Sequence, residues 1–185
     1  MKTQSLYQKA IKFAASKHAE QNQTVPGTNL PYVVHLSNVA MEIMIASFYT
    51  DDFDLDFAVQ VALLHDTIED TCTTFDELET EFGTDIAKAV LALTKNNSLP
   101  KEQQMNDSLK RIKSIPTEIW AVKLADRITN LQPPPPHWDN DRKNRYREEA
   151  KLIHSELKYG NEFLAKRLEG KIEEYGGFLE SESTT

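Results

Sequence analysis

The sequence has little of what marks a secreted or membrane protein. It contains one cysteine, Cys72, so no disulfide can form within the chain. A lone thiol suits a reducing compartment, and we expect a cytoplasmic protein. The first residues lack the apolar core of a signal peptide, and nowhere do about 18 apolar residues follow one another, as a membrane-spanning helix requires. We therefore expect no membrane partner.

An excess of positive charge is also missing. The chain has 21 Lys and Arg residues against 29 Asp and Glu residues, which gives a formal net charge of −8. This balance argues against nucleic-acid binding through a broad basic surface, so an anionic ligand has to be met by local cations. The 185 residues suffice for one domain with a proper core. Neither the length nor the net charge of the chain indicates an oligomeric state.

Signals for β-strands, internal repeats and domain linkers are absent as well. Apolar residues recur at helical spacing along most of the chain, so we expect an all-α bundle of about 8–10 helices. Asp54, Thr74 and Thr84 are predicted N-caps, and His18 is expected at the surface or at a helix end. The domain is expected to span residues 1–175, with a helix ending at Tyr175, and residues 176–185 to form a frayed tail.

The most informative stretch runs from Ala62 to Thr71. It places four ionisable side chains close together: His65, Asp66, Glu69 and Asp70. On a continuous helix from Asp54, His65 and Glu69 lie one turn apart, and so do Asp66 and Asp70. Three carboxylates beside an imidazole repel one another, and a divalent cation would compensate them. The alternative is a polar helix end in water, but the apolar run before His65 favours a cleft.

Two residues on other predicted core helices extend this group. His35 precedes His65 by 30 positions, and Asp126 follows Asp66 by 60. Singly, each suits a core helix without any ligand. Together they form an H…HD…D pattern, in which the chain resembles the HD-domain metal-dependent phosphohydrolases. The resemblance implies a single HD-domain bundle around one metal site, and two imidazoles with two carboxylates suit Mn²⁺, with Fe²⁺ or Zn²⁺ as alternatives.

Three segments narrow the resemblance. Pro31 to His35, Ala62 to Thr71 and Val122 to Leu131 are similar to the hydrolase domain of RelA/SpoT proteins over about residues 5 to 172. The Glu69-Asp70 pair is the specific part. No synthetase or regulatory region accompanies it, so we expect a stand-alone small alarmone hydrolase, the metazoan SpoT-like type included. The resemblance implies hydrolysis of the 3′-pyrophosphate of (p)ppGpp, which gives pyrophosphate and GDP or GTP.

The resemblance also implies roles for single residues. Glu69 and Asp70 would position a water molecule and take its proton, about one helical turn from the ligands. Asn130, four residues after Asp126, matches the position that contacts the ribose. Three further residues match positions near the substrate phosphates, and their alternative is a solvated surface: Lys101, Arg142 and Tyr146.

One departure from the family concerns the substrate. Family members carry an Arg-Lys pair before the Pro-Tyr segment, where the resemblance implies guanine stacking, but this chain has Asn22, Gln23 and Thr24. Losing a cation–π contact of about 0.5–2 kcal/mol weakens guanine preference. We therefore consider (p)ppApp, or another nucleotide with a 3′- or 2′-phosphate such as NADPH. A generic HD nucleotide phosphatase or phosphodiesterase and a catalytically silent nucleotide-binding module remain alternatives.

Overall fold

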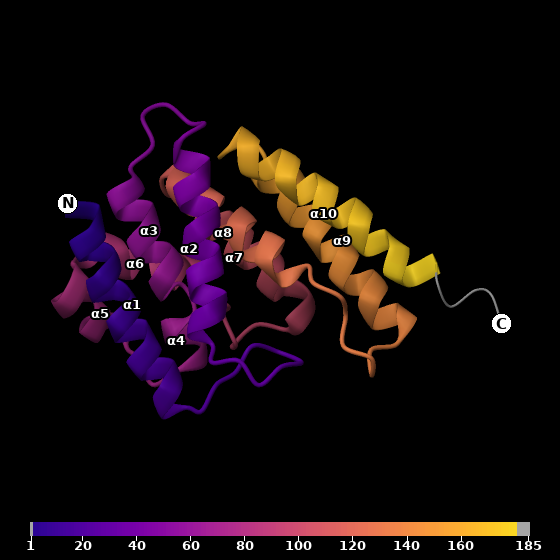
Figure 1. The fold of residues 1–185 in the computed structure, drawn as a ribbon, viewed down its shortest axis with the longest axis horizontal. Coiled ribbons are helices and arrows are strands. Elements are labelled where there is room, and N and C mark those ends of the chain that lie inside the picture. Colours follow the sequence, from indigo (N-terminus) through magenta and orange to yellow (C-terminus); the bar gives the residue numbers. More distant parts are fainter. Residues whose placement is uncertain (1, 181–185) are drawn as a thin grey trace.

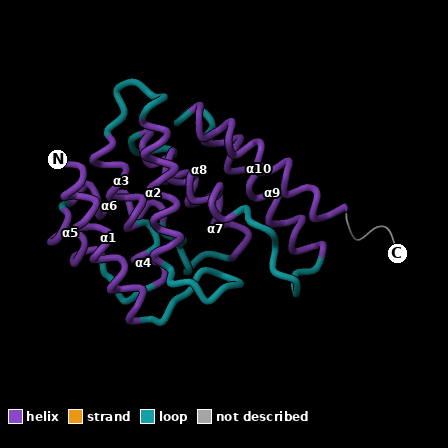
Figure 2. Tube along the Cα trace, in the orientation of Figure 1, coloured by secondary structure: helices purple, strands orange, loops and turns teal. Residues whose placement is uncertain are grey.

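The computed structural model describes residues 2 to 180, and every regular element within them is a helix (Figures 1 and 2). The ten helices of this part are α1 (Lys2–Glu20), α2 (Val33–Ser47), α3 (Leu55–Leu64), α4 (Thr67–Asp70), α5 (Phe75–Phe82), α6 (Thr84–Leu93), α7 (Lys101–Ile112), α8 (Thr117–Asn130), α9 (Asn140–Leu157) and α10 (Glu162–Glu180). An isolated β-bridge joins Thr24 to Pro31 in the loop between α1 and α2. The expected all-α fold is confirmed.

The core lies where α2, α3 and α8 pack against one another. Each contributes large apolar side chains that are at most 1% exposed: Leu36 and Ile43 from α2, Leu63 and Leu64 from α3, and Leu124 and Ile128 from α8. α1 covers α3, while α9 and α10 lie side by side and pack against α8 on the opposite side of the molecule (Figure 1). None of the helices in residues 2 to 180 has the length and apolar character that crossing a membrane requires.

Helix starts follow the side chains that can accept from free backbone N–H groups. The carboxylate of Asp54 accepts from Phe57 N at 3.0 Å, and the hydroxyl of Thr74 accepts from Glu77 N at 3.2 Å, as predicted for N-caps. The prediction for Thr84 is wrong. Gly83 is the N-cap of α6 with φ 91°, a conformation that favours glycine, and Thr84 is already the first helical residue.

The predicted continuous helix through His65 and Asp66 is interrupted. α3 ends at Leu64, and α4 is a single turn that begins at Thr67. Side chains form hydrogen bonds with the backbone carbonyl groups at the break. His65 Nδ1 contacts the carbonyl oxygen of Ala62 at 2.8 Å, and the Thr67 hydroxyl donates to the carbonyl of Leu64 at 2.7 Å. The break places His65 and Asp66 at a junction, where both can face the same cluster.

The last helix extends further than predicted. α10 continues from Tyr175 through Gly176 and Gly177 to Glu180, so the helix end expected at Tyr175 is wrong. A Cβ atom at residue 176 would lie 2.7 Å from an Arg147 terminal nitrogen, so the glycine there leaves room for the guanidinium of this α9 residue. Packing against α9 therefore outweighs the weak helix propensity of two glycines. The remainder of the predicted tail, residues 181–185, lies outside the described residues.

Candidate metal and substrate site

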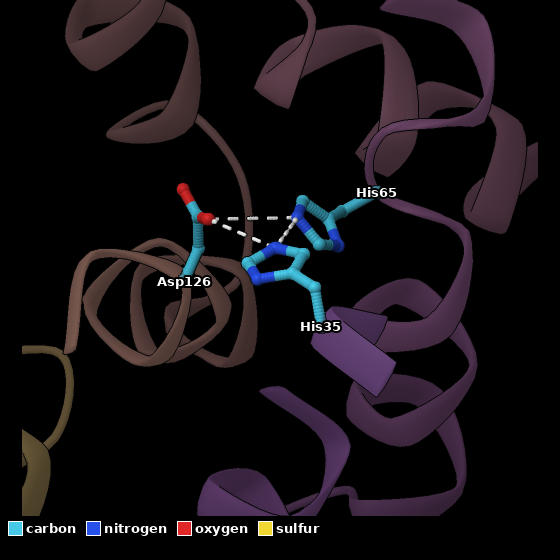
Figure 3. A group of neighbouring side chains, drawn as sticks. All are labelled: His35, His65 and Asp126. Atoms are coloured by element: carbon cyan, nitrogen blue, oxygen red, sulfur yellow. Dashed lines mark hydrogen bonds and ion pairs between the residues drawn. The ribbon is translucent and has the colours of Figure 1, made fainter. Parts of the chain in front are cut away.

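Two histidines and an aspartate from separate elements converge on one point (Figure 3). His35 comes from α2, His65 from the junction after α3, and Asp126 from α8. The two Nε2 atoms lie 3.4 Å apart, and Asp126 Oδ1 lies 3.5 Å from that of His35 and 3.6 Å from that of His65. All three side chains are buried. The three predicted ligands thus meet although 91 positions of sequence separate the first from the last.

Asp66 completes the group. Its Oδ2 atom lies 3.0 Å from His65 Nε2 and 3.7 Å from His35 Nε2. The same oxygen accepts a hydrogen bond from the Tyr32 hydroxyl at 2.5 Å. Tyr32 therefore orients Asp66 toward the imidazoles, and all four residues predicted as ligands are brought together.

The side chains of His35, His65 and Asp126 fit a divalent cation, and Asp66 lies beside the two imidazoles. Metal bonds of about 2.0–2.2 Å to nitrogen and carboxylate oxygen place neighbouring ligand atoms about 3–3.6 Å apart, close to the separations in this cluster. The donor atoms of His35, His65 and Asp126 all lie within 4.8 Å of one another. Because Ala62 O accepts from His65 Nδ1, the nitrogen of His65 left for a metal ion is Nε2, which faces the cluster. Two imidazoles and two carboxylates form a mixed donor set for a borderline divalent ion.

Opposite charges stabilise one another inside the cluster. Burial alone would lower the pKa of His65, but the carboxylates of Asp66 and Asp126 outweigh it and hold that pKa well above its ordinary value. Burial also opposes ionisation of Asp126, yet Lys123, whose Nζ lies 3.0 Å from Oδ2, and the imidazoles keep its pKa well below the usual range. The carboxylates are therefore charged, and binding a cation would release a proton from the His65 imidazole.

Glu69 and Asp70 have different partners. Glu69 pairs with Lys95: its Oε1 lies 2.7 Å from Lys95 Nζ, and its Oε2 accepts from the backbone N–H of Lys95 at 2.9 Å. Asp70 accepts a hydrogen bond from Gln23 Nε2 at 2.8 Å. Burial and then the charge of Asp66 raise the pKa of Asp70, while the Gln23 bond opposes this. The two acids, expected to act alike, thus occupy unlike environments.

A cavity of about 880 Å³ opens beside the metal-binding cluster, and His35 is part of its wall. All four residues predicted to contact substrate line this cavity: Lys101, Asn130, Arg142 and Tyr146. Asn130 Nδ2 donates to Asp126 Oδ1 at 2.5 Å, so Asn130 links the cavity to the cluster. The Arg142 guanidinium lies 4.2 Å from the centre of the Trp138 ring, which fixes its direction.

Several residues of the site were not predicted. Arg145 lines the cavity beside Arg142, one helical turn along α9. Tyr32 and Lys123 contact the carboxylates of the cluster, and both lie inside segments that carry the family resemblance. Lys95 and Gln23 lie in loops, and no sequence spacing connects them to Glu69 and Asp70. Their roles depend on how the loops fold back onto α4.

Comparisons with known proteins agree with this geometry. The HD domain family matches residues 10–161. The guanosine-3′,5′-bis(diphosphate) 3′-pyrophosphohydrolase MESH1 of Danio rerio is 35% identical over 171 residues, which cover 90% of this chain and 92% of that protein. Its Homo sapiens counterpart is 34% identical over 172 residues, 90% of this chain and 93% of that one.

A solved structure, described as a metazoan orthologue of SpoT that hydrolyses ppGpp, superposes with a TM-score of 0.78 at 28% identity. The superposition covers 92% of this chain and 96% of that one. The chain therefore belongs to the HD-domain family and is homologous to the MESH1 3′-pyrophosphohydrolases.

Proposed function

We propose that this chain is a metal-dependent hydrolase that removes the 3′-diphosphate of ppGpp or pppGpp and releases pyrophosphate with GDP or GTP. The observation that carries the proposal is one cavity that reaches from His35 of the cluster to three cationic side chains. These are Lys101, Arg142 and Arg145. In a chain of net charge −8, cations gathered in a cavity suit a polyanionic ligand. The names of the homologous proteins identify such a ligand.

The reaction adds water across the bond between the 3′ oxygen and its phosphorus atom. The hydroxide part joins phosphorus, and the proton ends on the 3′ oxygen of the nucleotide. A divalent cation at His35, His65, Asp66 and Asp126 would polarise the phosphoryl group and make water more acidic. Asp70 is the proposed proton acceptor, since its raised pKa brings it closer to the range of an effective base. Glu69, paired with Lys95, holds the α6–α7 loop beside α4.

The remaining side chains bind and orient the substrate. Lys101, Arg142 and Arg145 offset phosphate charge, and the fork of an arginine can bond two phosphate oxygens together. Asn130 is proposed to contact the ribose through the amide atoms that its bond to Asp126 leaves free. The phenol of Tyr146 stays protonated because burial raises its pKa to about 12, and it can donate to a phosphate oxygen.

Guanine is the base that the homologous proteins are named for, and none of these names supports an adenine substrate. The loop after α1 contributes the apolar side chains of Val25 and Pro26 to the cavity, whose wall also includes Pro133 to Pro135. Apolar walls can enclose either purine. Gln23 donates to Asp70 and is not among the residues that line this cavity. We propose guanine, with adenine as the comparison to measure.

One substrate panel tests the proposal. Purified protein is given ppGpp, pppGpp, ppApp, pppApp or NADPH, each with Mn²⁺, Fe²⁺, Zn²⁺ or a chelator, and the products are identified. We expect pyrophosphate from ppGpp with Mn²⁺ and none with the chelator. Orthophosphate as the product would favour a generic HD phosphatase, and higher turnover of ppApp than of ppGpp would overturn the guanine assignment. Binding without turnover of any substrate would identify a silent binding module.

A further inference from the structure

The side chain of Gln23 lies between a buried histidine and the proposed base. Gln23 Oε1 lies 2.5 Å from His18 Nδ1, and Gln23 Nε2 lies 2.8 Å from Asp70 Oδ2. The backbone of Gln23 is also held, since its N–H donates to the carbonyl of His18 at 3.1 Å and its carbonyl accepts from Tyr32 N at 3.2 Å. Asn22 supplies the turn that makes this possible, with φ 51°, a conformation that asparagine tolerates.

The chemistry of the three groups fixes the direction of both hydrogen bonds. An ionised carboxylate only accepts, so the NH₂ of Gln23 must face Asp70 and its oxygen must face His18. That oxygen only accepts, so Nδ1 of His18 carries the proton and Nε2 the lone pair. His18 Nε2 is buried without a partner among the described residues, and burial lowers the pKa of His18, so the ring is neutral. Among the described residues, Asp70 Oδ2 accepts from Gln23 and Asp70 Oδ1 has no hydrogen-bond partner.

His18 is itself held in place. The ring lies in the last turn of α1, is 1% exposed, and packs against Tyr32 with ring centres 4.7 Å apart. It was expected at a helix end or the surface, and it lies at the helix end but is buried. Tyr32 in turn bonds Asp66. One buried ring therefore supports Asp66 through Tyr32 and Asp70 through Gln23.

We propose that Gln23 and His18 are positioning residues that fix the Asp70 carboxylate, with Oδ2 bonded to Gln23 and Oδ1 directed to the attacking water. The inference rests on the proposed function of Asp70. A base has to lie about 2.6–3.2 Å from the proton that it removes, and a carboxylate on a one-turn helix needs support from outside that helix. The neutral residue at position 23, where the family carries a basic segment, acquires a function in this chain.

The kinetic test uses steady-state pyrophosphate release from ppGpp with Mn²⁺. Gln23→Ala is expected to lower kcat about tenfold and to change KM less than twofold. Gln23→Glu keeps the shape but loses the donor, so its kcat should fall at least as far. Gln21→Ala is the matched control, because Gln21 lies in the same loop but contacts Cys72 Sγ at 3.5 Å, and it should keep wild-type kcat. Wild-type kcat in both Gln23 variants would overturn the proposal.

Two further comparisons separate positioning from folding. In an Asp70→Asn background, Gln23→Ala should cause no additional loss of kcat, whereas independent effects that multiply would contradict the proposal. His18→Asn retains an N–H donor near the position of Nδ1, so it should keep more activity than His18→Ala. Equal loss in the two His18 variants at equal folded fraction would count against His18.

A spectroscopic readout keeps the inference testable apart from the activity. In ¹⁵N-labelled protein without added metal, the His18 nitrogen shifts should show a protonated Nδ1 and an unprotonated Nε2. Asp70→Asn should move the side-chain NH₂ signals of Gln23 and leave those of Gln21 unchanged. If the wild type releases no pyrophosphate from ppGpp, the proposed function fails. The NMR signals then test by themselves whether hydrogen bonds connect His18, Gln23 and Asp70. Unmoved Gln23 signals would overturn it.

Discussion

The carboxylate of Glu69 is paired with both the side chain and the backbone of Lys95, at 2.7 Å and 2.9 Å. Burial alone would lower the pKa of Lys95, but the charge of Glu69 outweighs it and raises that pKa, so the lysine remains charged. Asp70, the adjacent acid, has a neutral amide as its partner. The two acids should therefore respond differently to removal of their charge.

Asp70→Asn is expected to lower kcat roughly 100-fold or more, because it removes the proposed proton acceptor. Glu69→Gln should lower kcat by about fivefold. This factor corresponds to about 1 kcal/mol, the contribution of a partly exposed ion pair such as that between Glu69 and Lys95. Both variants keep the size of the side chain. The measurement is steady-state pyrophosphate release from ppGpp, with the folded fraction checked by circular dichroism. Near-normal kcat in Asp70→Asn would favour a phosphatase that depends on the metal site alone.

Removal of one predicted ligand should abolish metal binding. In the wild type, Mn²⁺ at 100 times its Kd should raise the free energy of unfolding by about 2.7 kcal/mol. His65→Ala and Asp126→Ala should lose this increase and the activity, since each contributes a donor atom to the cluster. His154→Ala, on α9 and outside the cluster, is the control. Urea unfolding with and without Mn²⁺ gives the result, and full activity in His65→Ala would exclude the metal site.

The sequence predicts the ligands better than their surroundings. His35 and Asp126 lie on apolar helices and are buried there, as helical periodicity predicts, whereas His65 and Asp66 follow the end of α3, where His65 is buried and Asp66 is partly exposed. The break after Leu64 was not predicted because it depends on side chains of His65 and Thr67 that bond nearby carbonyls. The contacts of Lys95 with Glu69 and of Gln23 with Asp70 are not predicted by the sequence, because both residues lie in loops whose conformations depend on tertiary contacts.

The cations of the cavity could be predicted only in part. The resemblance predicts Arg142 but not Arg145, which lies three positions later. Asp139 caps α9 by accepting from Arg142 N at 2.7 Å, and from there the helix directs both arginines to the cavity. Once the helix start is known, the shared face follows from the spacing of three residues. The cavity could not be predicted from the sequence, because the residues that line it come together only in the folded structure.

Arg142→Gln and Arg145→Gln should each raise KM for ppGpp about five- to tenfold, a loss of about 1 kcal/mol for a solvent-exposed cation at a phosphate. kcat should change less than twofold, because neither residue contacts the cluster. Lys166→Gln, an exposed position on α10, changes the net charge equally and should leave KM unchanged. An equal rise of KM in the Lys166 variant would mean that overall charge, and not the cavity, attracts the substrate.

The buried, neutral ring of His18 predicts a specific dependence of stability on pH. Burial lowers the pKa of His18 below the 6.5 of an unfolded histidine, although the Gln23 bond and the charges of Asp66 and Asp70 oppose the shift. At pH values between the lowered pKa of the folded state and 6.5, His18 binds a proton in the unfolded chain but not in the folded protein. The free energy of unfolding therefore falls as the pH decreases through this window, by up to about 1.4 kcal/mol per pH unit.

His18→Asn isolates this contribution, because asparagine does not titrate while every other ionisable group is retained. The raised pKa of His65 acts in the opposite direction in the metal-free protein, but it is common to both proteins and cancels in their difference. Urea unfolding of the two metal-free proteins at several pH values should give a wild-type advantage that grows as the pH rises to 6.5 and is constant above about 7.5. A difference independent of pH would mean that the His18 ring is protonated to the same extent in both states.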